Sequence, residues 1–143
     1  MAFRSVIPFD ARHIELALAL YRGCPGVGLS AGDSAPEIAA FLARNPGFSA
    51  VVETPAGELV GAVLCGHDGR RGFLYHLAVH PDERGRGLGR ALVAHSLSAL
   101  RVAGIPRVSI HLFTNNSDGA RFWAKLGWRV REDLSVQQVE LRD

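Results

Sequence analysis

The residues between Leu77 and Ala91 are of the types, and at the spacing, that bind an anion. An apolar strand pattern ends at His80-Pro81, and a helical pattern begins shortly after it. Arginine and glycine alternate in between, at Arg84, Gly85, Arg86, Gly87, Gly89 and Arg90. Glycine leaves backbone N–H groups open at a helix start, where the helix dipole also favours negative charge. Arginine adds charge-assisted hydrogen bonds to phosphate. The segment therefore predicts a cradle for a pyrophosphate group.

Two common phosphate-binding patterns are absent. The Walker pattern needs a lysine after its second glycine, and Lys125 is the only lysine of the chain. The dinucleotide fingerprint needs a small residue where Arg90 or Leu92 stands. Nucleotide hydrolysis and hydride transfer are therefore excluded. The formal net charge of +2 is small, so we expect no nucleic-acid partner and keep an arginine-rich nucleic-acid binder only as a rival class.

The cysteines do not indicate a metal centre. Cys24 and Cys65 are the only two, and they form no C-x-x-C pattern, so neither a zinc site nor a disulfide framework is expected. Cys65 stands in an apolar run and is predicted to be a core residue. Cys24 lies in a Gly/Pro-rich loop, where it is either a partly buried thiol or a nucleophile. We expect no bound metal.

The length of the chain matches one domain. A chain of 143 residues with 48% hydrophobic residues can bury a core without disulfides, so we expect a single domain over residues 1–143. No apolar run is long enough to span a membrane. The stretch from Met1 to Arg12 lacks the apolar core of a signal peptide. We therefore expect a cytoplasmic protein with no membrane partner.

Periodicity predicts eleven elements that would position the cradle. Strands are expected over 3–9, 48–53, 58–65, 72–80, 107–113, 128–131 and 135–141. Helices are expected over 11–21 and 87–103, together with one capped by Asp33 or Ser34 and ending near Asn45, and one capped by Ser117 and ended by Gly127. The order β-α-α-β-β-β-α-β-α-β-β combines antiparallel hairpins with one strand–helix–strand crossover, whose strands run parallel. We expect an α/β layered domain.

The cradle and a second motif resemble those of one known family. Arg84 to Gly89, following Leu77-Ala78-Val79, fits R-x-x-G-x-G and resembles the coenzyme A loop of the GCN5-related N-acetyltransferases (GNAT). Asn116 stands seven residues before Trp123, which is similar to the family's N-x(6)-Y-x-x-x-G-F segment. The order of elements also matches along nearly the whole chain. The resemblance implies a mixed, mostly antiparallel central sheet with helices on both faces and a splayed parallel strand pair in the middle.

The same resemblance implies a binding site for acetyl-CoA as cosubstrate. The backbone of Leu77, Ala78 and Val79 would pair with the pantetheine arm. The N–H groups from Arg84 to Arg90, including Leu88, would bind the pyrophosphate. The strands carrying Val79 and Ile110 would splay apart and leave a slot for the thioester. Asn116 would contact the pantetheine or the loop near it, with a helix cap as the alternative, and Trp123 would stand at the family's tyrosine position in this site.

The reaction implied is direct attack of a primary amine, on a small molecule or a peptide, on the acetyl thioester. The candidates for the general base are Tyr75, His111 and His76. Histidine titrates in the right range, but His76 points to the opposite face from Tyr75 unless the strand has a bulge. Each candidate is equally explained as a packed strand residue. Many relatives place a tyrosine acid at Trp123, and an indole N–H is no useful acid, so the proton donor to the thiolate stays open.

The acceptor side and the assembly are less defined. Asp33 or Asp68 could bind a cationic amine, although a helix cap explains Asp33 and a turn explains Asp68. His95 lies on the apolar face of its helix and is predicted to be a satisfied core histidine. A catalytically silent module that binds or senses coenzyme A is the rival to an enzyme. A homodimer is possible, as is common among similar proteins.

Overall fold

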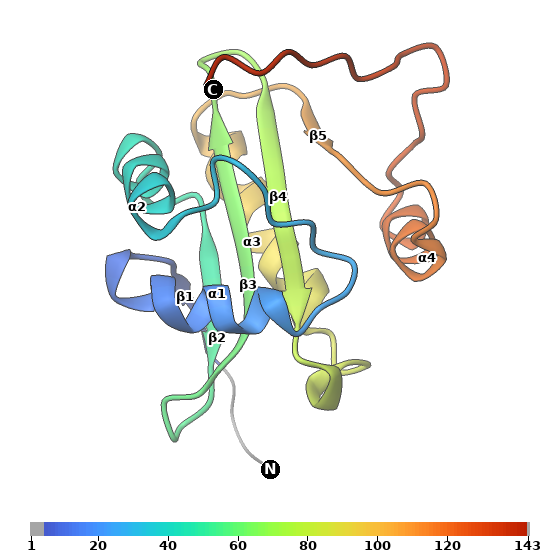
Figure 1. Cartoon of the computed structure of the whole chain (residues 1–143). Helices are drawn as coiled ribbons and strands as arrows, with labels where there is room; N and C mark the ends of the chain where they lie inside the picture. The colour runs from blue at the N-terminus through green and yellow to red at the C-terminus, as the bar shows by residue number, and fades with distance from the viewer. Residues whose placement is uncertain (1–4, 143) are drawn as a thin grey trace. The chain divides into compact units, whose positions relative to one another are not determined.

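The chain divides into two compact units. The computed structural model describes residues 5–142. The first unit runs to His111 and the second begins at Leu112, and Figure 1 labels the helices and strands of both. The single domain expected over residues 1–143 stays a prediction, and each unit is described here by itself.

The first unit is built on a five-stranded sheet whose order in space follows the chain. Its strands are β1 (Ser5–Pro8), β2 (Ala50–Glu53), β3 (Leu59–His67), β4 (Gly72–Val79) and β5 (Val108–Ile110). Neighbours up to β4 are antiparallel, whereas β5 runs parallel to β4. The predicted β2–β3 hairpin and the parallel crossover are thus confirmed. Phe3 and Arg4 of the first predicted strand lie outside the described residues.

Helices cover both faces of this sheet. α1 (Ile14–Arg22) and α2 (Ala35–Arg44) lie on one face and α3 (Leu88–Val102) on the other, as Figure 1 shows. Two glycines of β3 mark the faces, because residues of opposite parity in a strand point opposite ways. A Cβ at Gly66 would meet Phe41 of α2 at 2.8 Å, and one at Gly61 would meet Leu92 of α3 at 3.1 Å. The mixed sheet between helices confirms the expected fold class.

The start of α2 is fixed by a capping box. The Ser34 hydroxyl accepts the Glu37 N–H at 3.3 Å, and the Glu37 carboxylate accepts the Ser34 N–H at 3.4 Å. The expectation that Asp33 serves as a helix cap is therefore wrong, since Ser34 already fills that role. Asp33 is left to make contacts outside the helix.

The parallel strands separate after their first residues. The pairs between β4 and β5 end at Leu74 and Ile110, while β4 continues to Val79. The edge of β4 from Tyr75 to Val79 therefore has no strand beside it among the residues that the structure describes. The expected splay is present, but the pair closes the sheet at one edge instead of lying in its middle, because residues 111–142 add no strand.

The second unit contains α4 (Ser117–Lys125) followed by extended chain. The Asn116 side chain accepts the Gly119 N–H at 2.9 Å, so Asn116 caps this helix and the expected cap at Ser117 is wrong. The strands expected over 128–131 and 135–141 are not formed. Both segments carry apolar residues, but the second loses its alternation at Gln137-Gln138, and its Val139 is 80% exposed. A strand needs a partner as well as a pattern.

Candidate active site

The glycine–arginine loop forms an open row of backbone donors. Gly85 and Gly87 adopt φ angles of 78° and 81°, a left-handed conformation that glycine accepts without strain. The backbone N–H groups of residues 85 to 90 have no hydrogen-bond acceptor within the described part of the chain. α3 begins at Leu88, and no acidic residue stands in its first turn. Its N-cap residue is Gly87, so no side chain at that position accepts a hydrogen bond from the first N–H groups of the helix. The loop therefore offers unpaired donors and a positive helix end to an anion, as the sequence predicts.

The three arginines of this loop differ in their contacts. The Arg84 Nε donates to the Val79 carbonyl oxygen at 3.1 Å, so Arg84 ties the loop to the end of β4. Arg86 forms an ion pair with Glu83 at 3.5 Å. Arg90 is exposed in the first helical turn. Arg86 and Arg90 are thus better placed than Arg84 to turn toward a bound phosphate, while Arg84 fixes the position of the loop.

A β-bulge in β4 brings two candidate bases to one face. Ala78 pairs with Ala62 and Tyr75 pairs with Leu64, so His76 and Leu77 together lie opposite one residue of β3. Ala62, Leu64 and Ala78 belong to the same core cluster as α1, and Tyr75 contacts Phe41 of α2. Because of the extra residue, the side chains of β4 that face these helices are odd-numbered up to Tyr75 and even-numbered at Ala78. The sequence places His76 on the same face as Tyr75 only if the strand has a bulge, and the structure contains that bulge.

His76 has an unusual backbone at this bulge. Its φ angle is 51°, and it is the only residue other than glycine with positive φ among those the structure describes. Such a conformation costs on the order of 1–3 kcal/mol and is concentrated at functional sites. The strain therefore marks this position as a candidate site.

The side chain of His76 is held by Asp33. His76 Nε2 lies 2.9 Å from the Asp33 Oδ1, and the two side chains are only 16% and 17% exposed. The other carboxylate oxygen of Asp33 accepts the Ser30 N–H at 2.9 Å. A carboxylate accepts hydrogen bonds, so His76 Nε2 is the donor toward Asp33, and Nδ1 is the ring nitrogen that this bond does not use. The pair therefore presents one defined basic atom.

A buried tyrosine lies against this pair. The Tyr21 ring centre lies 5.4 Å from the centre of the His76 ring. The Tyr21 hydroxyl is buried and has no hydrogen-bond partner in the described part of the chain. Burial first, and the charges of Asp33 and Cys24 after it, raise the pKa of Tyr21 well above its ordinary value. Tyr21 is therefore a neutral wall of the site and supplies no base.

The other two candidate bases lie in a group of aromatic rings. Tyr75 stacks on Phe73 with ring centres 5.7 Å apart, and Phe73 meets His111 edge-on, also at 5.7 Å. Burial raises the pKa of Tyr75, which keeps its phenol protonated and makes it a poor base. His111 is exposed and has a ring contact with Phe73 alone. Of the three candidate bases, only His76 combines a histidine ring with a hydrogen-bond partner among the described residues.

The remaining predicted residues have clear structural roles. Cys24 and Cys65 are buried at 4% and 0% exposure, and the Asp68 carboxylate accepts the N–H groups of Arg70 and Arg71 at 2.8 Å, as expected of a turn residue. Asn116 and Trp123 belong to the second unit, where Trp123 is buried against Trp128 with ring centres 4.6 Å apart. Their roles toward a coenzyme stay predictions.

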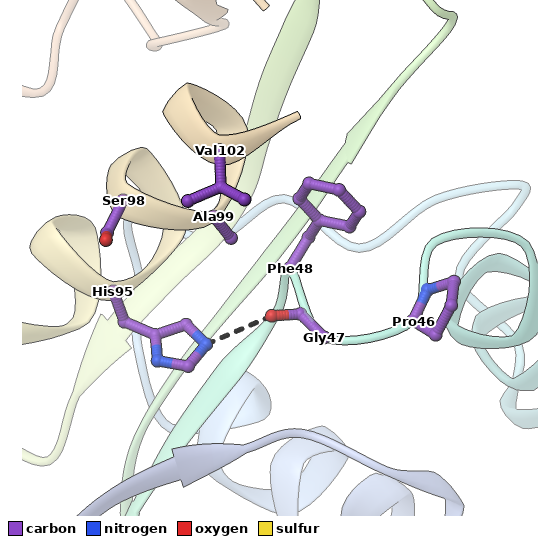
Figure 2. A pocket seen from close by; sticks show the side chains of 7 residues that line it. All are labelled: Pro46, Gly47, Phe48, His95, Ser98, Ala99 and Val102. Carbon is purple, nitrogen blue, oxygen red and sulfur yellow. Dashed lines mark hydrogen bonds between the residues drawn. The ribbon is translucent and has the colours of Figure 1, made fainter. Parts of the chain in front are cut away.

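The predicted core histidine lines a shallow hollow. His95 Nε2 bonds to the Gly47 carbonyl oxygen at 3.2 Å, which confirms that the ring is satisfied, although it is only partly buried. The hollow has a volume of about 410 Å³. Figure 2 shows His95 among its lining side chains, together with Phe48 and Val102. His95 is the only titratable side chain of that hollow, so the hollow brings no group of reactive side chains together.

Several of these residues carried no signal in the sequence. Phe41, Phe73 and Tyr21 read as ordinary core positions, and Asp33 as a possible cation ligand or cap. Only the fold shows that Asp33 meets His76. Among the residues described, no three His, Cys, Asp or Glu side chains come together as a metal site would require. Likewise, no helix within residues 5–142 is long and apolar enough to cross a membrane.

Known proteins agree with this architecture. Residues 15–128 match the model of the acetyltransferase (GNAT) family. The chain belongs to that family and is by class an N-acetyltransferase. Acetyltransferase plu1384 of Photorhabdus laumondii subsp. laumondii is 33% identical over 132 residues, which cover 90% of this chain and 88% of that protein.

Solved structures show the same fold. Ard1 from Thermoplasma volcanium superposes with a TM-score of 0.74 at 23% identity, over 90% of this chain and 84% of that one. The aminoglycoside N-acetyltransferase AAC(6')-Iy, solved in complex with CoA, gives a TM-score of 0.76 at 16% identity, over 97% of this chain and 96% of the other. The predicted family and fold class are confirmed.

Proposed function

We propose that this protein transfers the acetyl group of acetyl-CoA to a primary amine, on a small molecule or a peptide, by direct attack of the amine on the thioester. The observation that carries the proposal is that one strand, β4, joins two features. It leads at its end into the open row of donors at residues 85 to 90, and it carries the strained His76 at its bulge. An anion cradle beside a held base matches the needs of this reaction.

The chain's residues fit the coenzyme. Acetyl-CoA supplies an activated thioester, and the chain must hold its pyrophosphate and expose its acyl group. The N–H groups of residues 85 to 90, with Arg86 and Arg90, would hold the pyrophosphate. A Cβ at Gly85 or Gly87 would meet no atom within 4 Å, so the space over the loop is open. The unpaired edge of β4 up to Val79 leaves backbone groups for the pantetheine arm.

We assign the general base to His76. An ammonium group must lose a proton before it can attack, and a side chain with its lone pair fixed can accept that proton directly or through one water. Asp33 holds Nε2, which leaves Nδ1 as the acceptor. The raised pKa of Tyr75 and the absence of a hydrogen-bond partner on the His111 ring within the described residues favour His76 over both.

The test compares single variants in a steady-state assay that detects the free thiol of CoA, with a panel of amines. His76→Gln is expected to lower kcat/KM by roughly 100- to 10,000-fold, the usual contribution of a general base. His95→Gln is the matched control, because His95 is also partly buried and bonded through Nε2; its activity should stay within about threefold of the wild type, far below the base effect. Loss in His111→Gln with full activity in His76→Gln would move the base to His111.

A silent coenzyme A module is the second candidate function. Trp123 supports it, since an indole N–H cannot protonate the leaving thiolate. Under this alternative, calorimetry shows tight binding of CoA while no amine releases thiol. That combination would refute the enzyme and leave the cradle in place.

A further inference from the structure

A row of aromatic rings lies on the sheet face that His76 shares. The row, which we call the aromatic row, consists of Phe41, Tyr75, Phe73 and His111. The Phe41 and Tyr75 rings meet edge-on at 6.0 Å, Tyr75 stacks on Phe73 at 5.7 Å with 14° between the planes, and Phe73 meets His111 at 5.7 Å. α2, β4 and the residue after β5 thus contribute to one continuous surface, and its member Tyr75 is the neighbour of His76.

The rings of this row are not buried as core rings are. Phe41 and Phe73 are partly exposed, Tyr75 is 36% exposed, and His111 is exposed. By contrast, core residues of the same unit such as Tyr21 and Leu92 are at most 1% exposed. Aromatic rings with free faces gain stability when a flat or apolar group covers them. The row therefore has contact area left to offer.

The charges around the row restrict what can cover it. The aromatic row contains no carboxylate. Both carboxylate oxygens of Asp33 already accept hydrogen bonds, from Ser30 and His76. Glu37, one helical turn before Phe41, serves the capping box of α2. Within residues 5–142, a ligand with several cationic groups would have to compete for Asp33 and Glu37 with the hydrogen bonds that these carboxylates already accept, whereas a ligand with one amine and an apolar body needs only the base and the rings.

We propose that the acceptor is a primary amine carried by an aromatic or bulky apolar group. The group lies on the aromatic row and the amine reaches His76 Nδ1. This inference rests on the proposed acetyl transfer and names its acceptor class. Polyamines and other polycationic acceptors are excluded by it.

The first experiment compares three amines at equal acetyl-CoA: 2-phenylethylamine, ethylamine and spermidine. We expect kcat/KM for 2-phenylethylamine to exceed the values for both others by at least about tenfold, as an aromatic group moves from water onto the rings. Equal or higher values for ethylamine or spermidine would overturn the inference, while thiol release with any amine would still support acetyl transfer.

Two variants test whether the row causes the preference. Phe73→Leu removes the central ring and keeps an apolar side chain, so the ratio of kcat/KM for 2-phenylethylamine to kcat/KM for ethylamine should fall about tenfold. Phe48→Leu is the control, because Phe48 also makes one edge-on ring contact, with His67, outside the row. A Phe73→Leu protein that loses both amines equally, or keeps the full preference, would refute the role of the row.

Binding separates this inference from the enzyme proposal. Saturation-transfer NMR with CoA present reports amine binding without turnover. Binding of 2-phenylethylamine that Phe73→Leu abolishes supports the aromatic row even if no amine releases thiol, in which case only the proposed activity fails. Turnover of spermidine without binding of 2-phenylethylamine would refute the role of the aromatic row and would still support the proposed acetyl transfer. No binding and no turnover of any amine refutes both.

Discussion

Gly87 offers the sharpest test of the anion cradle. A substitution of glycine usually causes both backbone strain and a steric clash. At Gly87, where φ is 81° and no atom lies within 4 Å of a Cβ, it causes only the strain. A side chain there strains the backbone but collides with nothing. Replacing it by glutamate therefore places a carboxylate over the donors of residues 85 to 90 without breaking a packed contact, and CoA should no longer bind.

The size of the effect follows from two terms. A left-handed conformation costs a residue other than glycine about 1–2 kcal/mol of folding free energy, which for a chain of this size lowers Tm by about 3–7 °C. A carboxylate about 4 Å from a phosphate charge is repelled by about 4 kcal/mol at an effective dielectric constant of 20. Salt weakens that repulsion because the loop is exposed. We expect the Kd for CoA to rise about 100- to 1,000-fold.

The assay is calorimetric titration of CoA, paired with thermal melts. Gly57 provides the matched control: it has a φ angle of 85°, and its Cβ position is equally open, but it stands in the β2–β3 turn. Gly57→Glu should lower Tm as much as Gly87→Glu and leave the Kd within about twofold, because Gly57 stands outside the row of donors and salt screens its exposed charge. Gly87→Ala carries the strain without the charge and should bind CoA far better than Gly87→Glu.

The outcomes are distinct. If Gly87→Glu binds CoA within about threefold of the wild type, the repulsion expected from a nearby phosphate is absent and the pyrophosphate lies elsewhere. If Gly57→Glu weakens binding equally, the effect is one of net charge or stability and the cradle has no support.

Three further predictions concern the core. Tyr21→Phe removes a buried hydroxyl without a partner among the described residues and should raise the free energy of unfolding by about 1 kcal/mol in urea titrations; a decrease would mean that the hydroxyl has a partner. Burial raises the pKa of Cys65 to about 11, from an ordinary 9.0, so the free energy of unfolding should fall as pH rises from 9 to 11. In the Cys24→Ser protein, Cys65 is the remaining thiol and should react with thiol reagents only after unfolding; fast reaction of the native protein would contradict this. Gly66→Ala places a Cβ 2.7 Å from the Asn45 amide and should cost about 1–3 kcal/mol, measured by urea titration; unchanged stability would show that Asn45 can move aside.

The open row of donors at residues 85 to 90 could be predicted because the features that form it are local. Gly85, Gly87 and the arginines stand within one short segment, and each glycine's freedom and each helix-start donor depends on neighbours in the chain. The structure needs only to start α3 at the place the pattern indicates. The same holds for α1, α2 and the β2–β3 hairpin, whose periodicities and turn residues are contiguous.

The sequence narrows the proposed general base only to three candidates, because the Asp33 partner of His76 is remote in the chain. Asp33 and His76 are 43 positions apart, and no pattern in either segment refers to the other. Asp33 beside Ser34 is a good cap by local rules, yet only one of the two can fill the cap, and the fold gives it to Ser34. The other becomes free to reach β4.

The prediction of strands over 128–131 and 135–141 is wrong for a related reason, since a strand also depends on a partner elsewhere in the chain. Alternating apolar residues such as Val136 and Val139 show that a segment could form half of a pair, but hydrogen bonding to a neighbour completes a strand. β5 has only three residues and pairs only with the first half of β4, so it offers a short ladder to any segment that follows. The sequence contains no measure of that length.

Under the proposed function, the extra residue in β4 lets one strand contact the acceptor and the coenzyme independently. In a regular strand, a change that turns a side chain toward one face turns its neighbour away, so the residues before and after would have to change together. The bulge at His76 separates the two halves. Residues up to Tyr75 can diverge to suit a different acceptor while Ala78 and Val79 still lead into the same glycine loop. In a family that shares one coenzyme and differs in its acceptors, such a bulge lets the acceptor-binding residues change without altering the coenzyme-binding loop.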